Sequence, residues 1–318
     1  MRVSFFIDRR LTWFFGGVLA ALMVATLVGR ILLRNTSTAS SRATMVNLDA
    51  RIKSWWVMTA IFAAAVLTGR IGAVILFAVV SFLALREFIT LTPTRRGDHR
   101  ALFYGFFVGI PLQYCLVAIN WYGFFSVLIP VYAFLSIPTR SVLSGDTEHF
   151  LGRIAEIQWG LMVCVYCLSH APALLMLDIP GYVGQNAKLL LYLILVVQMS
   201  DVLQYVWGKL TGRHPIAPAV SPNKTIEGFV GGVLSATLLG TALWPMTPFL
   251  PWQAAGISLV ITLMGFAGGL TMSAIKRDRG VKDFGTAIAG HGGILDRIDS
   301  LCFAAPVFFH LTRYFFTP

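Results

Sequence analysis

Long apolar stretches separated by short polar ones run through most of the 318-residue chain. About twenty apolar residues cross the hydrocarbon core of a bilayer as a helix, in which every backbone polar group is satisfied within the segment. The pattern therefore predicts an all-α, polytopic transmembrane bundle of about nine to ten membrane helices. The expected helices cover residues 11–33, two helices within 55–91 broken at 69–72, and then 101–119, 122–137, 159–177, 186–198, 229–243, 252–272 and 302–316.

The stretch 35–51 is polar and rich in Ser and Thr, which is typical of a linker. It divides the chain into an N-terminal membrane helix with its linker, residues 1–54, and a membrane-embedded domain, residues 55–318. A cleaved signal peptide is the competing interpretation of the first apolar run. That run is too long for one, and no clear small-residue cleavage site follows it.

The composition supports the membrane interpretation, because 57% of the residues are hydrophobic and only 12% are charged. The net charge of +11 first suggests a nucleic-acid partner. The bases, however, are scattered between the expected spans, where they set topology and attract anionic headgroups. We therefore expect membrane lipids, and no nucleic acid, as partners.

The distribution of bases also predicts an orientation. With segment 273–300 placed in the cytoplasm, loops on that side hold eighteen of the twenty-five Lys and Arg residues, whereas the opposite loops hold Arg70, Lys188 and Arg313. This bias agrees with the positive-inside rule. We expect an integral protein of the bacterial inner (plasma) membrane with its site facing the cytoplasm. The orientation of the first helix is left undecided, because the same count places the basic N-terminus on the outer side.

Segment 273–300 is the richest in chemistry. Asp296 and Asp299 are three residues apart, so on a helix they share one face, and two such carboxylates favour a divalent cation. Gly292 and Gly293 let the backbone approach a ligand, and the free N–H groups of a helix starting after them would face an anion. An ordinary charged cytoplasmic loop explains the bases of this segment but not its acids.

A second polar segment begins at Asp201, where an expected apolar helix ends. That acid is either a ligand or a residue reaching the membrane interface. Further on, Lys224 and Thr225 offer a cation and a hydroxyl to a phosphate. The competing interpretation is a helix cap, with Thr225 or Ser221 as the N-cap.

Taken together, these motifs resemble those of the phosphatidate cytidylyltransferase (CDP-diacylglycerol synthase) family. The resemblance covers roughly residues 200–300. The matching residues are Ser200, Asp201, Tyr205, Gly208, Lys209, Ser221, Pro222, Lys224, Thr225, Glu227, Gly228, Ser273, Lys276, Arg277, Lys282, Asp283, Gly285, His291, Gly292, Gly293, Asp296, Arg297 and Asp299. Two positions depart from the family pattern, Ala289 and Gln204.

The resemblance implies transfer of a cytidylyl group from CTP to phosphatidate, giving CDP-diacylglycerol and pyrophosphate for phospholipid synthesis. It implies Mg²⁺, with a second cation left open, held by Asp201, Asp296 and Asp299, with Asp283 as a further candidate. The implied phosphate-neutralising and catalytic residues are Lys224, Lys276, Arg277, Lys282, His291 and Arg297. The implied substrate-binding residues are Ser221, Thr225, Tyr205, Gly292 and Gly293. His291 has an equally good interpretation as a residue that only orders the glycine turn.

Other functions stay open at this stage. One is a related paralogue that uses another lipid phosphate, and another is a catalytically silent membrane scaffold. A transporter would be expected to show discontinuous helix pairs in two related halves, whereas here the charge gathers in the C-terminal third. A homodimer is also left open.

Overall fold

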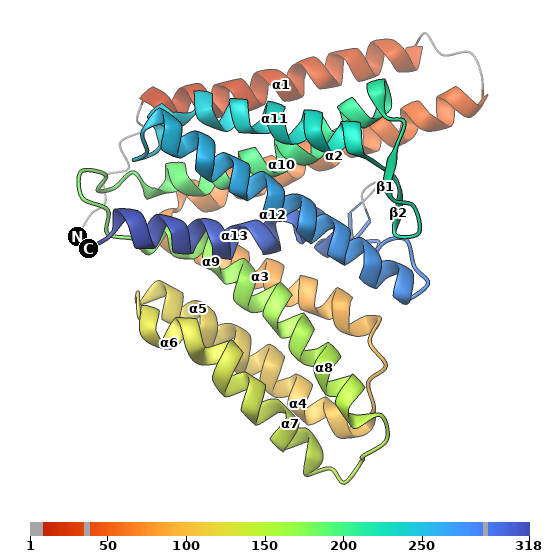
Figure 1. Ribbon diagram of the computed structural model, residues 1–318, viewed down its shortest axis with the longest axis vertical. Coiled ribbons are helices and arrows are strands. Elements are labelled where there is room, and N and C mark those ends of the chain that lie inside the picture. The colour runs from red at the N-terminus through yellow and green to blue at the C-terminus, as the bar shows by residue number, and fades with distance from the viewer. Residues whose placement is uncertain (1–8, 35–38, 289–291) are drawn as a thin grey trace.

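The computed structural model describes residues 9–34, 39–288 and 292–318. Within these residues the protein is a helical bundle with one short hairpin of strands (Figure 1). The α-helices are α1 (Arg9–Arg34), α2 (Ala39–Leu67), α3 (Gly69–Thr90), α4 (His99–Tyr104), α5 (Ile110–Ala118), α6 (Tyr122–Val127), α7 (Phe134–Val142), α8 (Phe150–Leu161), α9 (Leu168–Ala173), α10 (Asn186–Thr211), α11 (Ile226–Ala242), α12 (Pro251–Asp278) and α13 (Leu295–Phe316). The antiparallel strands are β1 (Pro215–Ala217) and β2 (Ser221–Thr225).

Several of these helices join into longer rods through wider π-helical turns. Such turns connect α4 to α5, α6 to α7 and α8 to α9. A π turn inserts an extra residue without ending the helix, so the rod continues. The bundle thus has fewer separate rods than its element labels suggest.

Six helical segments of the described chain are long and apolar enough to cross a membrane. They are Gly69–Thr90, Arg96–Ala118, Tyr122–Val142, Phe150–Met176, Asn186–Thr211 and Pro251–Asp278. Three shorter apolar helices, Gly16–Ile31, Ile52–Leu67 and Ile226–Ala242, accompany them. Together with α13, these shorter helices account for the difference from the nine to ten expected. The predicted polytopic helical bundle is confirmed.

Two predicted boundaries are wrong. The expected linker 35–51 is helical from Ala39 onward, because its Ala, Arg and Met residues are good helix formers that extend the apolar half of α2. The second is the expected helix end near Asp201. Helix α10 continues to Thr211, so that carboxylate lies inside the helix rather than at its end.

A single apolar core runs through the bundle from α3 to α13. Tyr192 of α10 packs against Phe249 and Phe308, with ring centroids 6.2 and 5.9 Å from its own. Its hydroxyl lies 2.5 Å from the Ser258 hydroxyl of α12, so the one buried polar atom of this side chain is satisfied. This packing fixes α10, α12 and α13 against one another.

A buried ion pair stabilises the connections at one end of the bundle. Arg153 Nε lies 2.9 Å from Asp98 Oδ2, and the Ser141 hydroxyl donates to Asp98 Oδ1 at 2.5 Å. Nearby, Arg279 at the end of α12 pairs with Glu156 of α8 at 2.6 Å. The second pair ties the end of α12 to α8.

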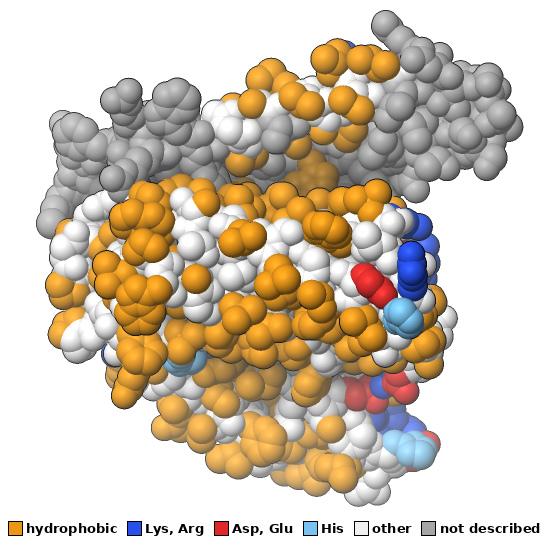
Figure 2. Space-filling model, turned by 45° about the horizontal axis from the view of Figure 1, so that its top comes forward, with side chains coloured by type: hydrophobic (Ala, Val, Ile, Leu, Met, Phe, Trp, Pro, Cys, Tyr) orange, Lys and Arg blue, Asp and Glu red, His pale blue; other side chains and the backbone are white. Residues whose placement is uncertain are grey.

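Most of the charged side chains visible in Figure 2 gather along one edge of the molecule, and the rest of the visible described surface is largely apolar. The hairpin β1–β2 lies at one end of the bundle in Figure 1, beside the end of α12. An apolar band with charge at its end is the distribution that a bilayer imposes on an integral membrane protein.

Candidate active site

The carboxylate of Asp296 is held entirely by the protein. Its Oδ1 accepts a hydrogen bond from Lys276 Nζ at 2.8 Å, and its Oδ2 accepts from the Phe284 and Gly293 N–H groups at 2.8 and 2.9 Å. The side chain is only 3% exposed. Asp296 therefore fastens α12, segment 281–294 and α13 together.

The beginning of α13 is closed by an acid that lies more than two hundred residues away in sequence. The Ile294 and Leu295 N–H groups donate to Glu87 Oε1 and Oε2 of α3, each at 2.9 Å. A carboxylate is favoured there, since it satisfies two N–H groups that have no partner inside the helix and lies at the positive end of the helix dipole.

The predicted open helix end is consequently wrong. The first N–H groups of α13 already bind Glu87, and that of Gly293 binds Asp296, so they do not face an external anion. Glycine is nevertheless required here. Gly292 has φ +83°, and a Cβ at Gly293 would collide with the Glu87 carboxylate.

Asp299 lies one helical turn after Asp296 on α13, as predicted, but has different neighbours. Its Oδ1 accepts from the Ser300 N–H at 2.7 Å. Across the helix interface, the Asp201 carboxylate of α10 is stabilised by the nearby Ser300 side chain and is close enough to Asp299 for mutual repulsion. Two carboxylates from different helices thus meet around one serine.

Lys224 provides positive charge beside this carboxylate pair. Strand β2 places its ammonium 4.9 Å from the centroid of the Phe266 ring and directly against Gly269 of α12, where a Cβ would lie 3.0 Å from Nζ. Burial lowers the pKa of Lys224, and attraction to Asp201 and Asp299 opposes that shift. The lysine is therefore partly desolvated and faces two acids.

Two further bases complete the cluster. Lys276 donates a hydrogen bond to Asp296 and also attracts the Asp299 carboxylate. Arg297 attracts the Asp201 carboxylate. The structure thus brings together predicted site residues from four elements, α10, β2, α12 and α13. We call this set the acid–base cluster: Asp201, Lys224, Lys276, Asp296, Arg297 and Asp299.

The hairpin holds Lys224 in place through the start of α11. Thr225 is the N-cap of that helix, and its hydroxyl accepts from the Gly228 N–H at 3.1 Å. Glu227 in the first turn accepts from the Arg213 N–H at 3.0 Å and pairs with the His214 ring at 2.6 Å. The helix-cap interpretation of Thr225 is confirmed, and its role in substrate binding stays a prediction.

Three other predicted residues lie around segment 281–288 rather than in the cluster. Arg277 donates to the carbonyl groups of Val220 and Val281 at 3.2 and 3.0 Å, which links the hairpin to the end of α12. Lys282 and Asp283 are exposed. The Asp283 Cβ lies close to Gly292, 3.1 Å from where a Cβ would stand.

The remaining predicted residues are spread over the surface or not described. Tyr205 points outward from α10 with 64% of its surface exposed, and Lys209 lies over its ring at 5.8 Å. Ser221 begins β2. His291 lies outside the described residues, so its predicted role stays a prediction.

The carboxylates differ in how well they fit a bound cation. Both oxygens of Asp296 are occupied, whereas the carboxylates of Asp201 and Asp299 repel each other. Among the described residues, no group of three or more His, Cys, Asp and Glu side chains lies close enough to hold a metal ion. A divalent cation could take oxygen ligands from the Asp201–Asp299 pair and complete its shell with water and substrate oxygens, the usual habit of Mg²⁺.

Phe284 and Glu87 are the site residues that sequence reasoning missed. Phe284 is buried, stacks on Phe88 of α3 with ring centroids 6.3 Å apart, and lies under the Lys276 ammonium at 5.4 Å. The available signal for Glu87 was a single acid near the end of an otherwise apolar helix. Such an acid is costly unless it has a partner, and therefore indicates one.

Comparison with known proteins places the chain among transferases. The sequence model of the family described as "Cytidylyltransferase family" matches residues 49–315. That range contains every residue of the acid–base cluster and Glu87, and it omits α1.

Individual relatives divide into two kinds. A protein of Escherichia coli K12 named "Uncharacterized protein YnbB" is 42% identical over 297 residues, 93% of this chain and 96% of the relative. Phosphatidate cytidylyltransferase of Staphylococcus aureus strain COL is 40% identical over 126 residues, 39% of this chain and 48% of the enzyme. The enzyme of Staphylococcus haemolyticus is 40% identical over 120 residues, 37% of this chain and 46% of that enzyme. The matched part thus spans about half the length of the staphylococcal enzymes.

Proposed function

The chain belongs to the cytidylyltransferase family, and from this premise we propose that it transfers the cytidylyl group of CTP to phosphatidate. A phosphate oxygen of phosphatidate would attack the α-phosphorus of CTP. The bond from that phosphorus to the α,β-bridging oxygen would break, and pyrophosphate would leave with the electron pair. The products are CDP-diacylglycerol and pyrophosphate.

The observation that supports this proposal most is the acid–base cluster. Lys224 faces Asp201 and Asp299, while Lys276 is held by Asp296. The lipid phosphate is already anionic near neutral pH, so the protein needs no general base. Its task is to position two phosphorylated substrates and neutralise their crowded charge, which is the largest contribution in reactions of this kind.

Each cluster residue then has a role that follows from its contacts. Lys224 is partly desolvated, which strengthens its attraction to a phosphate oxygen. The Lys276 ammonium has three donors and uses one on Asp296, so the others can bind a phosphate while the lysine stays in place. Asp201 and Asp299 would hold Mg²⁺, which, when bound, neutralises triphosphate charge.

The proposed setting is the bacterial inner membrane, with the cluster facing the cytoplasm where CTP is available. The protein is an integral membrane protein, and Lys224 of the cluster lies on the β1–β2 hairpin, which is at one end of the bundle in Figure 1. The excess of bases in the loops at this end supports the orientation.

The test is incorporation of labelled CTP into lipid by the purified, detergent-solubilised protein. Phosphatidate and Mg²⁺ should yield labelled CDP-diacylglycerol with pyrophosphate in equal amount, and excess EDTA should abolish it. Equal turnover with UTP or ATP would assign the protein to another nucleotidyltransferase class. Full turnover in EDTA with metal-free reagents would overturn the carboxylate–metal assignment.

A second candidate, a related enzyme that uses another lipid phosphate, is favoured by a specific observation. The similarity to phosphatidate cytidylyltransferase of Staphylococcus aureus covers only 39% of this chain. The relative that is matched over 96% of its length, YnbB, has a name that states no activity. A parallel assay with lysophosphatidate and a polyprenyl phosphate separates the two. Preference for either acceptor over phosphatidate would replace the first candidate.

A further inference from the structure

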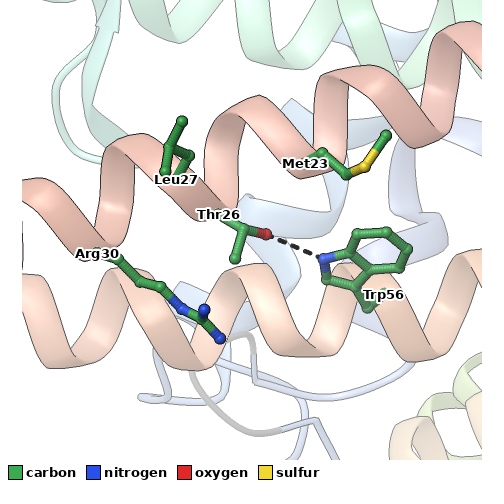
Figure 3. Close-up of a pocket in the computed structure, with 5 residues that line it drawn as sticks. All are labelled: Met23, Thr26, Leu27, Arg30 and Trp56. Carbon is green, nitrogen blue, oxygen red and sulfur yellow. Dashed lines mark hydrogen bonds between the residues drawn. The ribbon is translucent and has the colours of Figure 1, made fainter.

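A groove between α1 and α2 lies outside everything described so far. It has a volume of about 400 Å³ and is lined by Met23, Thr26, Leu27 and Arg30 of α1 and by Trp56 of α2 (Figure 3). This size is within the range of sites that take small molecules. Helix α1 precedes the residues that match the family, whereas Trp56 lies within them, so only the α1 side of the groove is outside the matched region.

The uncharged polar groups of the groove are satisfied internally. The Trp56 indole N–H donates to Thr26 Oγ1 at 3.1 Å, and the Thr26 hydroxyl donates to the Leu22 carbonyl at 2.7 Å. Figure 3 shows the bond between Trp56 and Thr26 bridging the two helices, with Arg30 about one turn further along α1. At Gly29 the helices come so close that a Cβ would lie 2.9 Å from Ile52 Cδ1. The groove is therefore a built feature between two helices in contact.

Arg30 is exposed beside an apolar surface, and the groove itself contains no acid to balance it. The sequence from Arg9 to Leu67 has seven bases and a single acid, Asp49. That acid pairs with Lys53 at 2.7 Å. The positive charge of Arg30 therefore favours binding of an anion in the groove.

The surroundings of the groove are those of a lipid-facing helix. Met23 and Leu27, on the groove, are 57% and 61% exposed, and Val28 on the rest of the surface is 48% exposed. The C-terminal end of α1 lies on the same side of the molecule as the β1–β2 hairpin in Figure 1, at the charged end. Arg30 lies one turn before the end of α1, and Trp56 lies near the start of the apolar stretch Ile52–Leu67 of α2. Arginine and tryptophan at the edge of an apolar stretch are typical of headgroup depth in a bilayer.

We propose that this groove binds one phospholipid with an anionic headgroup. Its phosphate would bind the Arg30 guanidinium, which suits phosphate because it offers a planar pair of N–H donors. One acyl chain would lie along Met23 and Leu27 toward the bilayer centre, packed against the Trp56 ring. This lipid is distinct from the substrate at the acid–base cluster, and its binding needs neither CTP nor turnover.

The experiment is native mass spectrometry of the full chain, purified in detergent and exposed to defined lipids without nucleotide. The wild type should retain about one phosphatidylglycerol per chain and little phosphatidylcholine. Arg30→Gln should reduce retained phosphatidylglycerol at least fivefold, whereas Arg30→Lys should reduce it less. Arg70→Gln, an equal loss of charge at an exposed position in the first turn of α3, should leave retention unchanged.

A second variant keeps the test decisive if Arg30→Gln is not monodisperse. Leu27→Trp fills the groove and preserves the arginine, so it should displace the lipid with the charge intact. Equal phosphatidylglycerol retention by wild type, Arg30→Gln and Leu27→Trp would overturn the proposal. Equal retention of phosphatidylcholine and phosphatidylglycerol by the wild type would do the same, since it would indicate only an unspecific lipid annulus.

Discussion

The two acids Asp299 and Asp278 stand in contrasting surroundings, although they lie twenty-one residues apart in one polar segment. Asp299 faces Asp201 across a helix interface and is attracted by Lys224 and Lys276. Asp278 is 73% exposed and pairs with its neighbour Arg279 at 3.3 Å. One is part of the acid–base cluster, and the other balances surface charge.

We therefore predict that Asp299→Asn lowers kcat by roughly a hundredfold or more, because it removes a carboxylate whose work is electrostatic stabilisation of the transition state. Asp278→Asn should keep most activity and change stability by less than about 0.5 kcal/mol. Both are measured as CTP incorporation at matched expression and monodispersity. Similar rates for the two variants would contradict the assignment of the cluster.

Glu87 gives a second prediction at the scale of one residue. A Gln side chain has one acceptor oxygen, whereas the Glu87 carboxylate accepts from two N–H groups, those of Ile294 and Leu295. In Glu87→Gln, one of these N–H groups would therefore lose its acceptor and face the amide NH₂ group. We expect Glu87→Gln to destabilise the protein by about 1–3 kcal/mol, the cost of an unsatisfied buried donor. Activity should fall as well, since α13 carries Asp299. The thermal unfolding midpoint in detergent and kcat are the measurements.

The matched control for Glu87 is Glu148→Gln. Glu148 is 61% exposed and pairs with Arg95 at the surface, where such pairs contribute roughly 0–1 kcal/mol. Equal midpoints and rates for both variants would show that the contact with α13 is not structural.

The difference between predicted and missed residues has a physical basis. Asp201, Lys224 and Asp299 belong to local motifs that a sequence displays directly. Glu87 meets its partners only through the tertiary packing of α3 against α13, and no local spacing encodes that contact. The protein partners of Asp296 were not predicted for the same reason, because they depend on where the fold brings Lys276 and Phe284.

At the scale of elements, the connection between α12 and α13 contains two glycines in the same backbone region. Gly280 has φ +66° and Gly292 has φ +83°. A side chain at either position would cost about 1–2 kcal/mol of stability through backbone strain. Their surroundings differ. Nothing lies within 4 Å of a Cβ at Gly280, whereas a Cβ at Gly292 would stand 2.9 Å from Asp296 Oδ2.

We predict that Gly280→Ala lowers the unfolding midpoint slightly with kcat within about twofold of wild type, consistent with strain alone. Gly292→Ala should lower kcat at least tenfold, because it also displaces the carboxylate that holds Lys276. Both variants are compared by midpoint and by CTP incorporation. Equal losses of activity would indicate that strain, and not the position of Asp296, controls the site.

The hydrophobic pattern predicted which helices exist, but it did not predict where they begin and end. Polar residues 39–51 extend α2, and α10 continues ten residues beyond Asp201. A charged residue ends an apolar run without ending a helix, since backbone hydrogen bonds continue through it. The all-α prediction contained no strand around Lys224, and the pairing of β2 with β1 depends on residues on both sides of a tight connection.

On the scale of the whole molecule, the cluster is carried by the C-terminal helices and hairpin and is positioned by a helix from the N-terminal part of the chain. Elements α10, β2, α12 and α13 carry its side chains, and α3 supplies the acid that positions α13. The pair between Arg279 and Glu156 adds a second tie, between the end of α12 and α8. A shift of α3 relative to α13 would therefore alter the start of α13 before it altered the carboxylates themselves.

The last prediction concerns orientation, which decides whether the cluster can reach CTP. Asn223 lies in the hairpin at the charged end, and Val183, 81% exposed, lies in the connection before α10 at the other end (Figure 1). With Cys115 replaced by Ala to remove the exposed native thiol, we expect Val183→Cys to react with a membrane-impermeant maleimide in intact spheroplasts. Asn223→Cys should react only after permeabilisation, because the excess of bases retains its end in the cytoplasm. The Cys115→Ala parent supplies the background labelling. Labelling of Asn223→Cys from outside, with Val183→Cys protected, would reverse the topology and separate the acid–base cluster from the cytoplasmic nucleotide.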